Sequence, residues 1–189
     1  SHAGTTPMDR RRDAAAAVAE LMLFVERRAA ADGDSVGTVG MLQVPNGSIN
    51  VVPGRCLFSL DLRAPNNAQR DKLADDVLTE LAAICTRRGV HHSVTETMRA
   101  SAAPSAPEWQ ARWEKAVAAL GVPLHHMPSG AGHDAMKLHE IMPQAMLFVR
   151  GLNSGISHNP LESTTNDDMQ LAIDAFAHLL SDLAQTPAD

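Results

Sequence analysis

The chain has 189 residues, of which 44% are hydrophobic and 20% are charged, and this balance is that of a globular protein able to bury a core. Its formal net charge of -6 argues against a nucleic-acid-binding protein, because binding to phosphates needs clustered lysine and arginine. No stretch approaches the roughly 20 apolar residues of a membrane span, and no secretory signal opens the sequence. We therefore expect a cytoplasmic protein that binds neither nucleic acid nor membranes.

The first part of the chain, residues 1–105, is predicted to contain three strands and two helices. In chain order these are a helix at 8–31, strands at 36–44 and 56–63, a helix at 66–88 and a strand at 91–98. One further strand before Ser1 would complete the βαββαβ order of a ferredoxin-like sandwich. The predicted class is α/β, with an α+β first domain that lacks its first strand.

Local signals support these elements. Thr5 or Thr6 can cap the first helix, with Pro7 at its first position, and Gly89 can close the second helix. In the second strand apolar and polar residues alternate from Phe58 to Arg63, which is typical of a half-buried strand with one polar face. Cys56 and Cys85 are far apart and lack metal-like spacing, so the sequence favours buried thiols and a reducing compartment.

The second part, residues 106–189, follows a linker rich in Ala, Ser and Pro. Its predicted elements are helices at 108–120, 133–140 and 166–184 and one strand at 145–149, with a Gly-rich loop at 129–132. One or two strands are too few for a sheet with covered edges. This part therefore reads as the C-terminal portion of a larger α/β domain.

Three segments could carry chemistry. Gly130 and Gly132 precede a helix beginning at His133, where free N–H groups attract anions, although a simple tight loop has the same pattern. His158 follows a predicted strand and could bind a metal or move protons, or could be a loop histidine bonded to backbone. Arg63 ends a polar strand face, where it could grip a carboxylate or be an ordinary surface arginine.

Taken together, five pieces of the sequence resemble the hydantoinase/carbamoylase family of M20-type amidases. These metal-dependent enzymes hydrolyse N-carbamoyl-L-amino acids, allantoate and similar ureido acids. The matching pieces are residues 2–8 with Arg11 or Arg12 and Asp13, residues 45–54, the strand end 60–63, and residues 129–135 and 155–160. They occur in the family's order and span nearly the whole chain.

The resemblance implies a role for each candidate residue. His2 would be the lid histidine that stabilises the oxyanion, often in the partner subunit's site. Asn50 and Arg63 would bind the substrate carboxylate, together with the Gly130–Gly132 loop and His133 beside it. His158 would be one ligand of a site for two divalent metals, with zinc favoured and manganese, cobalt or nickel compatible. The first domain would be a lid through which a homodimer forms.

The resemblance also assigns the other metal ligands and the general-base glutamate to an N-terminal segment that this sequence does not contain. A catalytic zinc needs about three protein ligands. We therefore expect a truncated form that, alone, holds no metal tightly and does not turn over the parent enzyme's substrate by metal-activated water. An aminoacylase or peptidase of the same superfamily and a non-catalytic dimerisation module stay open as alternatives.

Overall fold

The structure, a computed structural model, describes residues 1–185 and divides into two compact units. The first unit holds Ser1–Ala102 together with Pro128–Ala131, and the second holds Ala103–Met127 and the residues from Gly132 onward. The first unit combines helices with short antiparallel strands, so the mixed α/β class is correct at that level. The assignment of 1–105 to a lid and of 106–189 to a catalytic domain stays a prediction.

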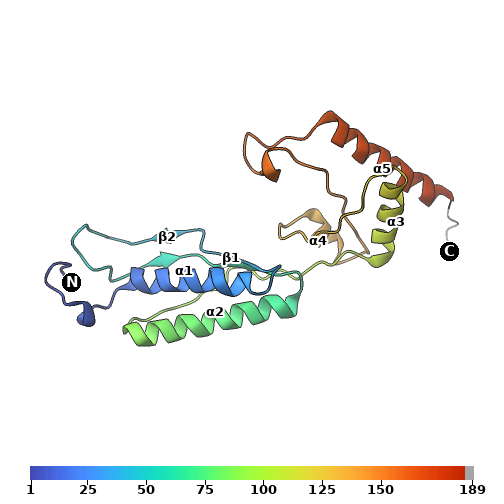
Figure 1. Cartoon of the computed structure of the whole chain (residues 1–189). Coiled ribbons are helices and arrows are strands. Elements are labelled where there is room, and N and C mark those ends of the chain that lie inside the picture. The colour runs from blue at the N-terminus through green and yellow to red at the C-terminus, as the bar shows by residue number, and fades with distance from the viewer. Residues whose placement is uncertain (186–189) are drawn as a thin grey trace. The chain divides into compact units, whose positions relative to one another are not determined.

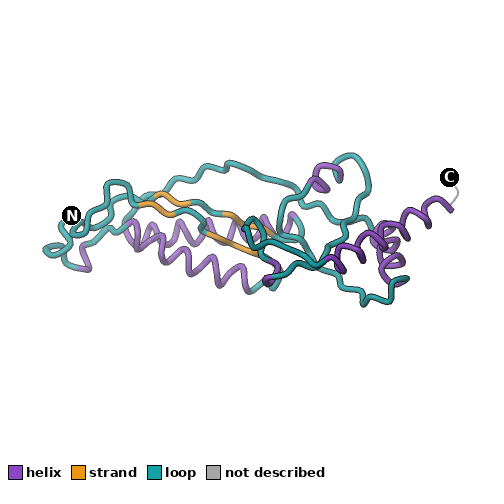
Figure 2. Tube along the Cα trace, turned by 90° about the horizontal axis from the view of Figure 1, so that it is seen from above, coloured by secondary structure: helices purple, strands orange, loops and turns teal. Residues whose placement is uncertain are grey.

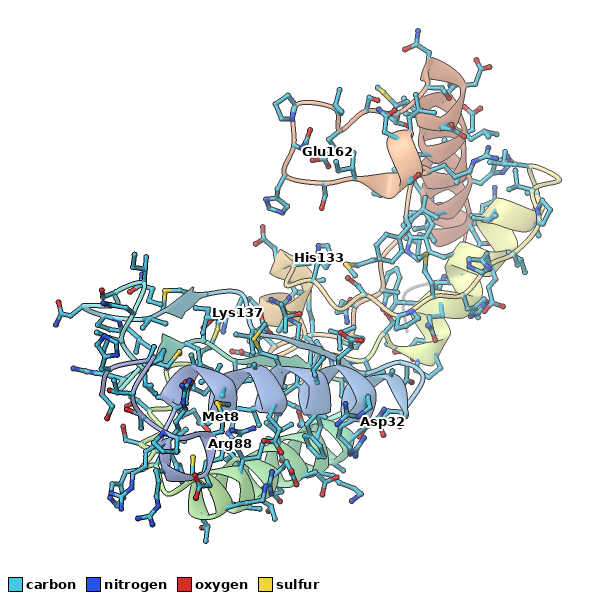
Figure 3. The ribbon with its side chains drawn as sticks, turned by 60° about the vertical axis from the view of Figure 1, so that its left-hand side comes forward. Met8, Asp32, Arg88, His133, Lys137 and Glu162 are labelled. Atoms are coloured by element: carbon cyan, nitrogen blue, oxygen red, sulfur yellow. The ribbon has the colours of Figure 1, made fainter. Side chains whose placement is uncertain are left out.

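Two long helices form one layer of the first unit. They are α1 (Ala14–Ala30) and α2 (Asn67–Arg88), which lie side by side and run in opposite directions (Figure 1). Asp32 just beyond α1 and Arg88 at the end of α2 consequently mark opposite ends of the pair (Figure 3). As the sequence predicts, Gly89 closes α2 in the left-handed conformation, with φ of 64°.

The start of the first helix differs from the prediction. A short 3-10 helix, η1 (Met8–Arg10), comes first, the chain becomes extended at Arg11, and α1 begins only at Ala14. The cap is Asp13, whose side chain accepts a hydrogen bond from the Ala16 amide at 3.0 Å. The predicted Thr5 or Thr6 cap is wrong because Asp13 lies nearer the apolar run and supplies a carboxylate for the free N–H groups.

The core of the first unit lies between α1, α2 and the strands. Five side chains are fully buried: Leu21, Val25, Leu73, Val77 and Ile84. Each such burial stabilises the fold by about 1.5–3 kcal/mol relative to exposure. Phe58, Leu60 and Leu62 pack against this cluster from the strand side, as their alternation predicts. Cys85 is also buried and unpaired.

Each strand predicted in the first unit around residues 36–44 and 56–63 is divided in two. Strand β1 (Val36–Thr38) pairs antiparallel with β4 (Asp61–Arg63), and β2 (Leu42–Gln43) pairs antiparallel with β3 (Leu57–Phe58) (Figure 2). Between the two ladders the Ser59 hydroxyl accepts a hydrogen bond from the Met41 amide at 3.0 Å. The Ser59 amide donates in turn to the Met41 carbonyl at 3.1 Å, so a side-chain oxygen replaces one of the two backbone acceptors at this point.

The prediction of a strand at 91–98 is wrong for the described residues. A strand needs a ladder partner, and within residues 1–185 this segment makes no backbone hydrogen bonds of that kind. Side chains instead tie the following residues to α2. Arg99 pairs with Asp71 at 2.7 Å, and the Ala102 amide donates to the Asn67 side chain at 2.8 Å.

The second unit is built on helices α3 (Pro107–Ala118), α4 (Asp134–Leu138) and α5 (Asn166–Gln185), with the 3-10 turn η2 (Asn153–Gly155). Helices α3 and α5 pack together, with Trp113 and Phe176 rings 5.4 Å apart and a Lys115–Asp182 ion pair. The predicted strand at 145–149 is wrong: within the described part of the chain it has no ladder partner. Among the described residues, no helix is long and apolar enough to cross a membrane.

Candidate functional site

A hollow of about 470 Å³ opens over the polar face of β1 and β4 in the first unit. Its lining residues are Val36, Thr38, Gly40, Ser59, Asp61, Arg63, Gly130 and Ala131. The antiparallel register sets Thr38 opposite Asp61 and Val36 opposite Arg63. Side chains two apart share one face of a strand, so Asp61 and Arg63 both face the hollow while Leu62 packs on the core.

Arg63 makes three hydrogen bonds at this site. Its Nε and Nη2 donate to the two Asp61 carboxylate oxygens at 2.8 Å and 2.6 Å, and its Nη1 donates to the Gly130 carbonyl at 2.8 Å. The Arg63 hydrogen bonds lower the pKa of Asp61, and Asp61 raises the pKa of Arg63. Both side chains stay about half exposed, so the charged groups remain accessible to a ligand.

The structure thus brings Arg63 and Gly130, two of the predicted site residues, into direct contact. They are 67 positions apart in the chain. Charged N–H donors beside a hollow of this size suit a small ligand with a carboxylate, because guanidinium groups bind carboxylates in a planar fork.

His2 and Asn50 also become neighbours, through backbone pairing at the start of the chain. The Ala3 amide donates to the Asn50 carbonyl at 2.8 Å, and the Val52 amide donates to the Ser1 carbonyl at 2.8 Å. The two side chains are exposed and are not among the lining residues of the Arg63 hollow. Asn50 Oδ1 accepts a hydrogen bond from Ser48 at 3.1 Å.

The His2 ring has a defined orientation. Its Nδ1 accepts a hydrogen bond from the Gly4 amide at 3.0 Å. A neutral imidazole whose Nδ1 accepts carries its proton on Nε2. A neutral His2 ring that accepts this hydrogen bond therefore offers an Nε2–H donor.

Gly132 and His133 lie in the second unit, at the start of α4. His133 is the residue that precedes the helix, and its ring lies 6.3 Å from the Phe148 ring in an edge-on arrangement. Figure 3 shows His133 at this position, with Lys137 on the helix that follows. Both Gly132 and His133 are exposed.

His158 lies on the exposed loop between η2 and α5. Its backbone is in the left-handed region with φ of 55°, which is uncommon for residues other than glycine. The carboxylate of Glu162, which is labelled on this loop in Figure 3, accepts a hydrogen bond from the His158 amide at 2.9 Å. Glu162 is thus one of the residues that hold the loop conformation, and His158 is exposed.

Comparisons with known proteins place these features in a family. Residues 6–182 match the profile described as peptidase family M20/M25/M40. The chain belongs to this family. It is 36% identical over 184 residues to an N-carbamoyl-L-amino acid amidohydrolase of Geobacillus stearothermophilus, and 31% identical over 185 residues to an allantoate amidohydrolase of Bacillus subtilis. Each alignment covers 97% of this chain and 45% of the relative.

A solved structure agrees with the sequence relatives. An amidase of the hydantoinase/carbamoylase family from Burkholderia multivorans superposes with a TM-score of 0.94 and 31% identity, over 100% of this chain and 46% of that one. This M20-family chain therefore spans about half the length of the relatives that it matches, and its fold is that of the corresponding half.

The M20 family includes dinuclear metal-binding peptidases, so divalent metals are expected of it. The residues that the structure describes do not fit such a centre by themselves. Within residues 1–185, no group of three or more His, Cys, Asp and Glu side chains is placed to hold a metal ion. His158 can serve at most as a single ligand.

Two residues of the site region have contacts that sequence reasoning missed. Arg11 donates from Nε to the Thr6 carbonyl at 3.0 Å and from Nη2 to the Ala3 carbonyl, which shapes the loop that carries His2. Asp61 holds Arg63. The signal for Asp61 was present in the strand alternation, because residues two apart face the same way. Arg11 was named, together with Arg12 as the alternative, only as part of the family resemblance, and its contacts with backbone carbonyls were not predicted.

Proposed function

We propose that this chain is part of an amidohydrolase that cleaves a linear amide or ureido C–N bond in a small acid, such as an N-carbamoyl-L-amino acid or allantoate. The observation that carries the proposal is the 36% identity to an N-carbamoyl-L-amino acid amidohydrolase along 97% of the chain. The Arg63 hollow supports it independently, because these substrates share a carboxylate.

In this proposal Arg63 and Asn50 bind the substrate carboxylate, and the backbone around Gly130 and Gly132 adds N–H donors with His133 beside it. His2 donates from Nε2 to the oxygen on which negative charge develops, in its own or a partner subunit's site. A positioned donor of this kind contributes about 3 kcal/mol to lowering the barrier. His158 is one ligand of a divalent metal centre, in which zinc is favoured and manganese, cobalt or nickel are compatible.

We also propose that the first unit is a ferredoxin-like lid and forms a homodimer. The observation in its favour is the short ladder pairs over one helix layer, which leave strand edges for another copy to extend. Light scattering of the purified protein should give twice the mass of one chain, and a monomer at high concentration would refute the dimer.

The activity is tested by a substrate screen of the natural gene product that contains this sequence. N-carbamoyl-L-amino acids and allantoate should release ammonia, whereas N-acetyl-amino acids and dipeptides should react much more slowly. Turnover confined to the N-acetyl compounds or dipeptides would instead identify an aminoacylase or peptidase of the same superfamily. The 189-residue chain, assayed in parallel, is expected to give no turnover.

A further inference from the structure

The carboxylate of Asp61 is the one acidic group among the described residues that line the hollow, and it lies directly against the arginine proposed to bind a carboxylate ligand. An acid at an anion-binding site should repel the ligand. Its presence there needs a physical reason, and the geometry of the Asp61–Arg63 pair supplies one.

A guanidinium has five N–H donors, one on Nε and two on each terminal nitrogen. Asp61 takes the Nε–H and one Nη2–H, and the Gly130 carbonyl takes one Nη1–H. Five donors less these three leave one N–H on Nη1 and one on Nη2. Because Asp61 occupies the Nε side, the remaining Nη2–H lies on the end of the guanidinium beside Nη1, and this end is the part that can offer donors to a second carboxylate.

Without Asp61, the Arg63 side chain would keep only the Gly130 carbonyl as a partner. Arg63 is 47% exposed, and a long exposed arginine samples many rotamers. The Asp61 carboxylate accepts two hydrogen bonds from one edge of the guanidinium and fixes the orientation of its plane. Because this orientation is set before the ligand binds, less side-chain entropy of Arg63 is lost on binding.

We propose that Asp61 is a positioning residue, which holds one edge of the Arg63 guanidinium so that the remaining Nη1 and Nη2 donors face a ligand carboxylate in the hollow. The inference rests on the proposed function, because it presumes that Arg63 binds the carboxylate. It adds a residue for which the family resemblance implied no role.

The positioning role and a purely electrostatic role predict opposite signs. If Asp61 acted only through its charge, Asp61→Asn would remove a repulsion and tighten the binding of an anion. If Asp61 orients Arg63, the same change leaves one weaker hydrogen bond and binding becomes weaker. Asp61→Ser removes both hydrogen bonds and should weaken binding at least as much, while Asp61→Glu keeps the carboxylate and should restore part of the affinity.

The experiment is a titration of the 189-residue chain with N-carbamoylglycine, followed by the arginine Nε–Hε signals in ¹H–¹⁵N spectra. The Arg63 signal should shift on saturation in the unsubstituted chain. We expect the dissociation constant to rise about 3- to 10-fold in Asp61→Asn, a loss of roughly 0.7–1.4 kcal/mol in binding. The matched control is Asp75→Asn, which removes the same charge from an exposed position of α2 and should leave the constant unchanged.

The carboxylate site and the positioning role of Asp61 can be refuted separately. If Arg63→Met binds as well as the unsubstituted chain, judged by the backbone amide signals of β1 and β4, or if the unsubstituted chain shows no saturable shift, the carboxylate site itself is refuted. If Arg63→Met loses binding but Asp61→Asn and Asp61→Ser bind equally or more tightly, only the positioning role is refuted. Should either Asp61 variant fail to fold, judged by the backbone signals of β1 and β4, the other one decides.

Discussion

At the scale of single residues, the space around a side chain and the charges next to it decide which substitutions a position can accept. Gly37 in β1 shows the first constraint: a Cβ added there would lie 2.6 Å from Val25 Cγ1 and 3.2 Å from Leu62 Cδ2. Such distances require backbone or side-chain shifts in a packed core. Asp61 and Arg63 show the second constraint, because their opposite charges are adjacent in an exposed site and hold each other in place.

Gly37→Ala should therefore destabilise the first unit by about 1–3 kcal/mol, the usual cost of overpacking a core. Urea unfolding followed by circular dichroism measures this change. Gly54→Ala is the matched control, because a Cβ there meets nothing within 4 Å. A Gly37→Ala variant as stable as the control would contradict the described contact between β1 and α1.

The Arg28 cluster predicts a pH dependence of stability. Hydrogen bonds from Arg28 lower the pKa of Asp32 and are the largest cause lowering the pKa of Asp76. These carboxylates therefore stay ionised to lower pH in the folded state than in the unfolded chain. Their contribution is present above the unfolded pKa and is lost as the pH falls through the folded one, below about pH 4.

Acid titration of the unfolding free energy measures this effect. Arg28→Met should flatten the decline below about pH 4 relative to the unsubstituted chain, because the pKa values of both carboxylates return toward the ordinary value. Arg10→Met is the control, since within residues 1–185 the ion-pair partner of Arg10 is the exposed Asp9 at 3.7 Å. An equal decline of the unfolding free energy in Arg28→Met and Arg10→Met would show that the Arg28 cluster does not cause the loss of stability at low pH.

At the scale of elements, helices were predictable where local signals decide them. The predicted helix at 66–88 matches α2 to within one residue, and Gly89 closes it as predicted, whereas Asn66, placed inside the predicted helix, is its N-cap. The start of α1 was misjudged because two sets of capping residues are present in the sequence, and the one nearer the apolar run, Asp13, is the cap. Strand limits were misjudged because they depend on a partner far away in the sequence.

The capping of α1 gives a direct test of that correction. Asp13→Ala should cost about 0.5–2 kcal/mol of unfolding free energy, whereas Asp13→Asn should cost much less because an amide oxygen still caps. Thr5→Ala is the control and should be neutral if Asp13 is the cap. A loss in Thr5→Ala comparable to that in Asp13→Ala would restore the cap first predicted from sequence.

At the scale of the whole molecule, the sequence was sufficient for the class, the two long helices of the first unit and the family. It was not sufficient for the geometry of the site. The Arg63–Gly130 contact joins residues 67 positions apart, and the pairing of His2 with the segment around Asn50 depends on backbone hydrogen bonds that no local pattern encodes. The predicted roles of all seven site residues stay predictions: His2, Asn50, Arg63, Gly130, Gly132, His133 and His158.

The most direct test of the central claim compares two substrates on the natural gene product that contains this sequence. Arg63→Met should lower kcat/KM for an N-carbamoyl-L-amino acid by roughly 100-fold, a loss of about 3 kcal/mol in transition-state stabilisation. For the neutral amide of the same compound, which lacks the carboxylate, the change should be less than about twofold. An equal loss on both substrates, or no loss on the acid, would contradict the assignment of Arg63 as the carboxylate-binding residue.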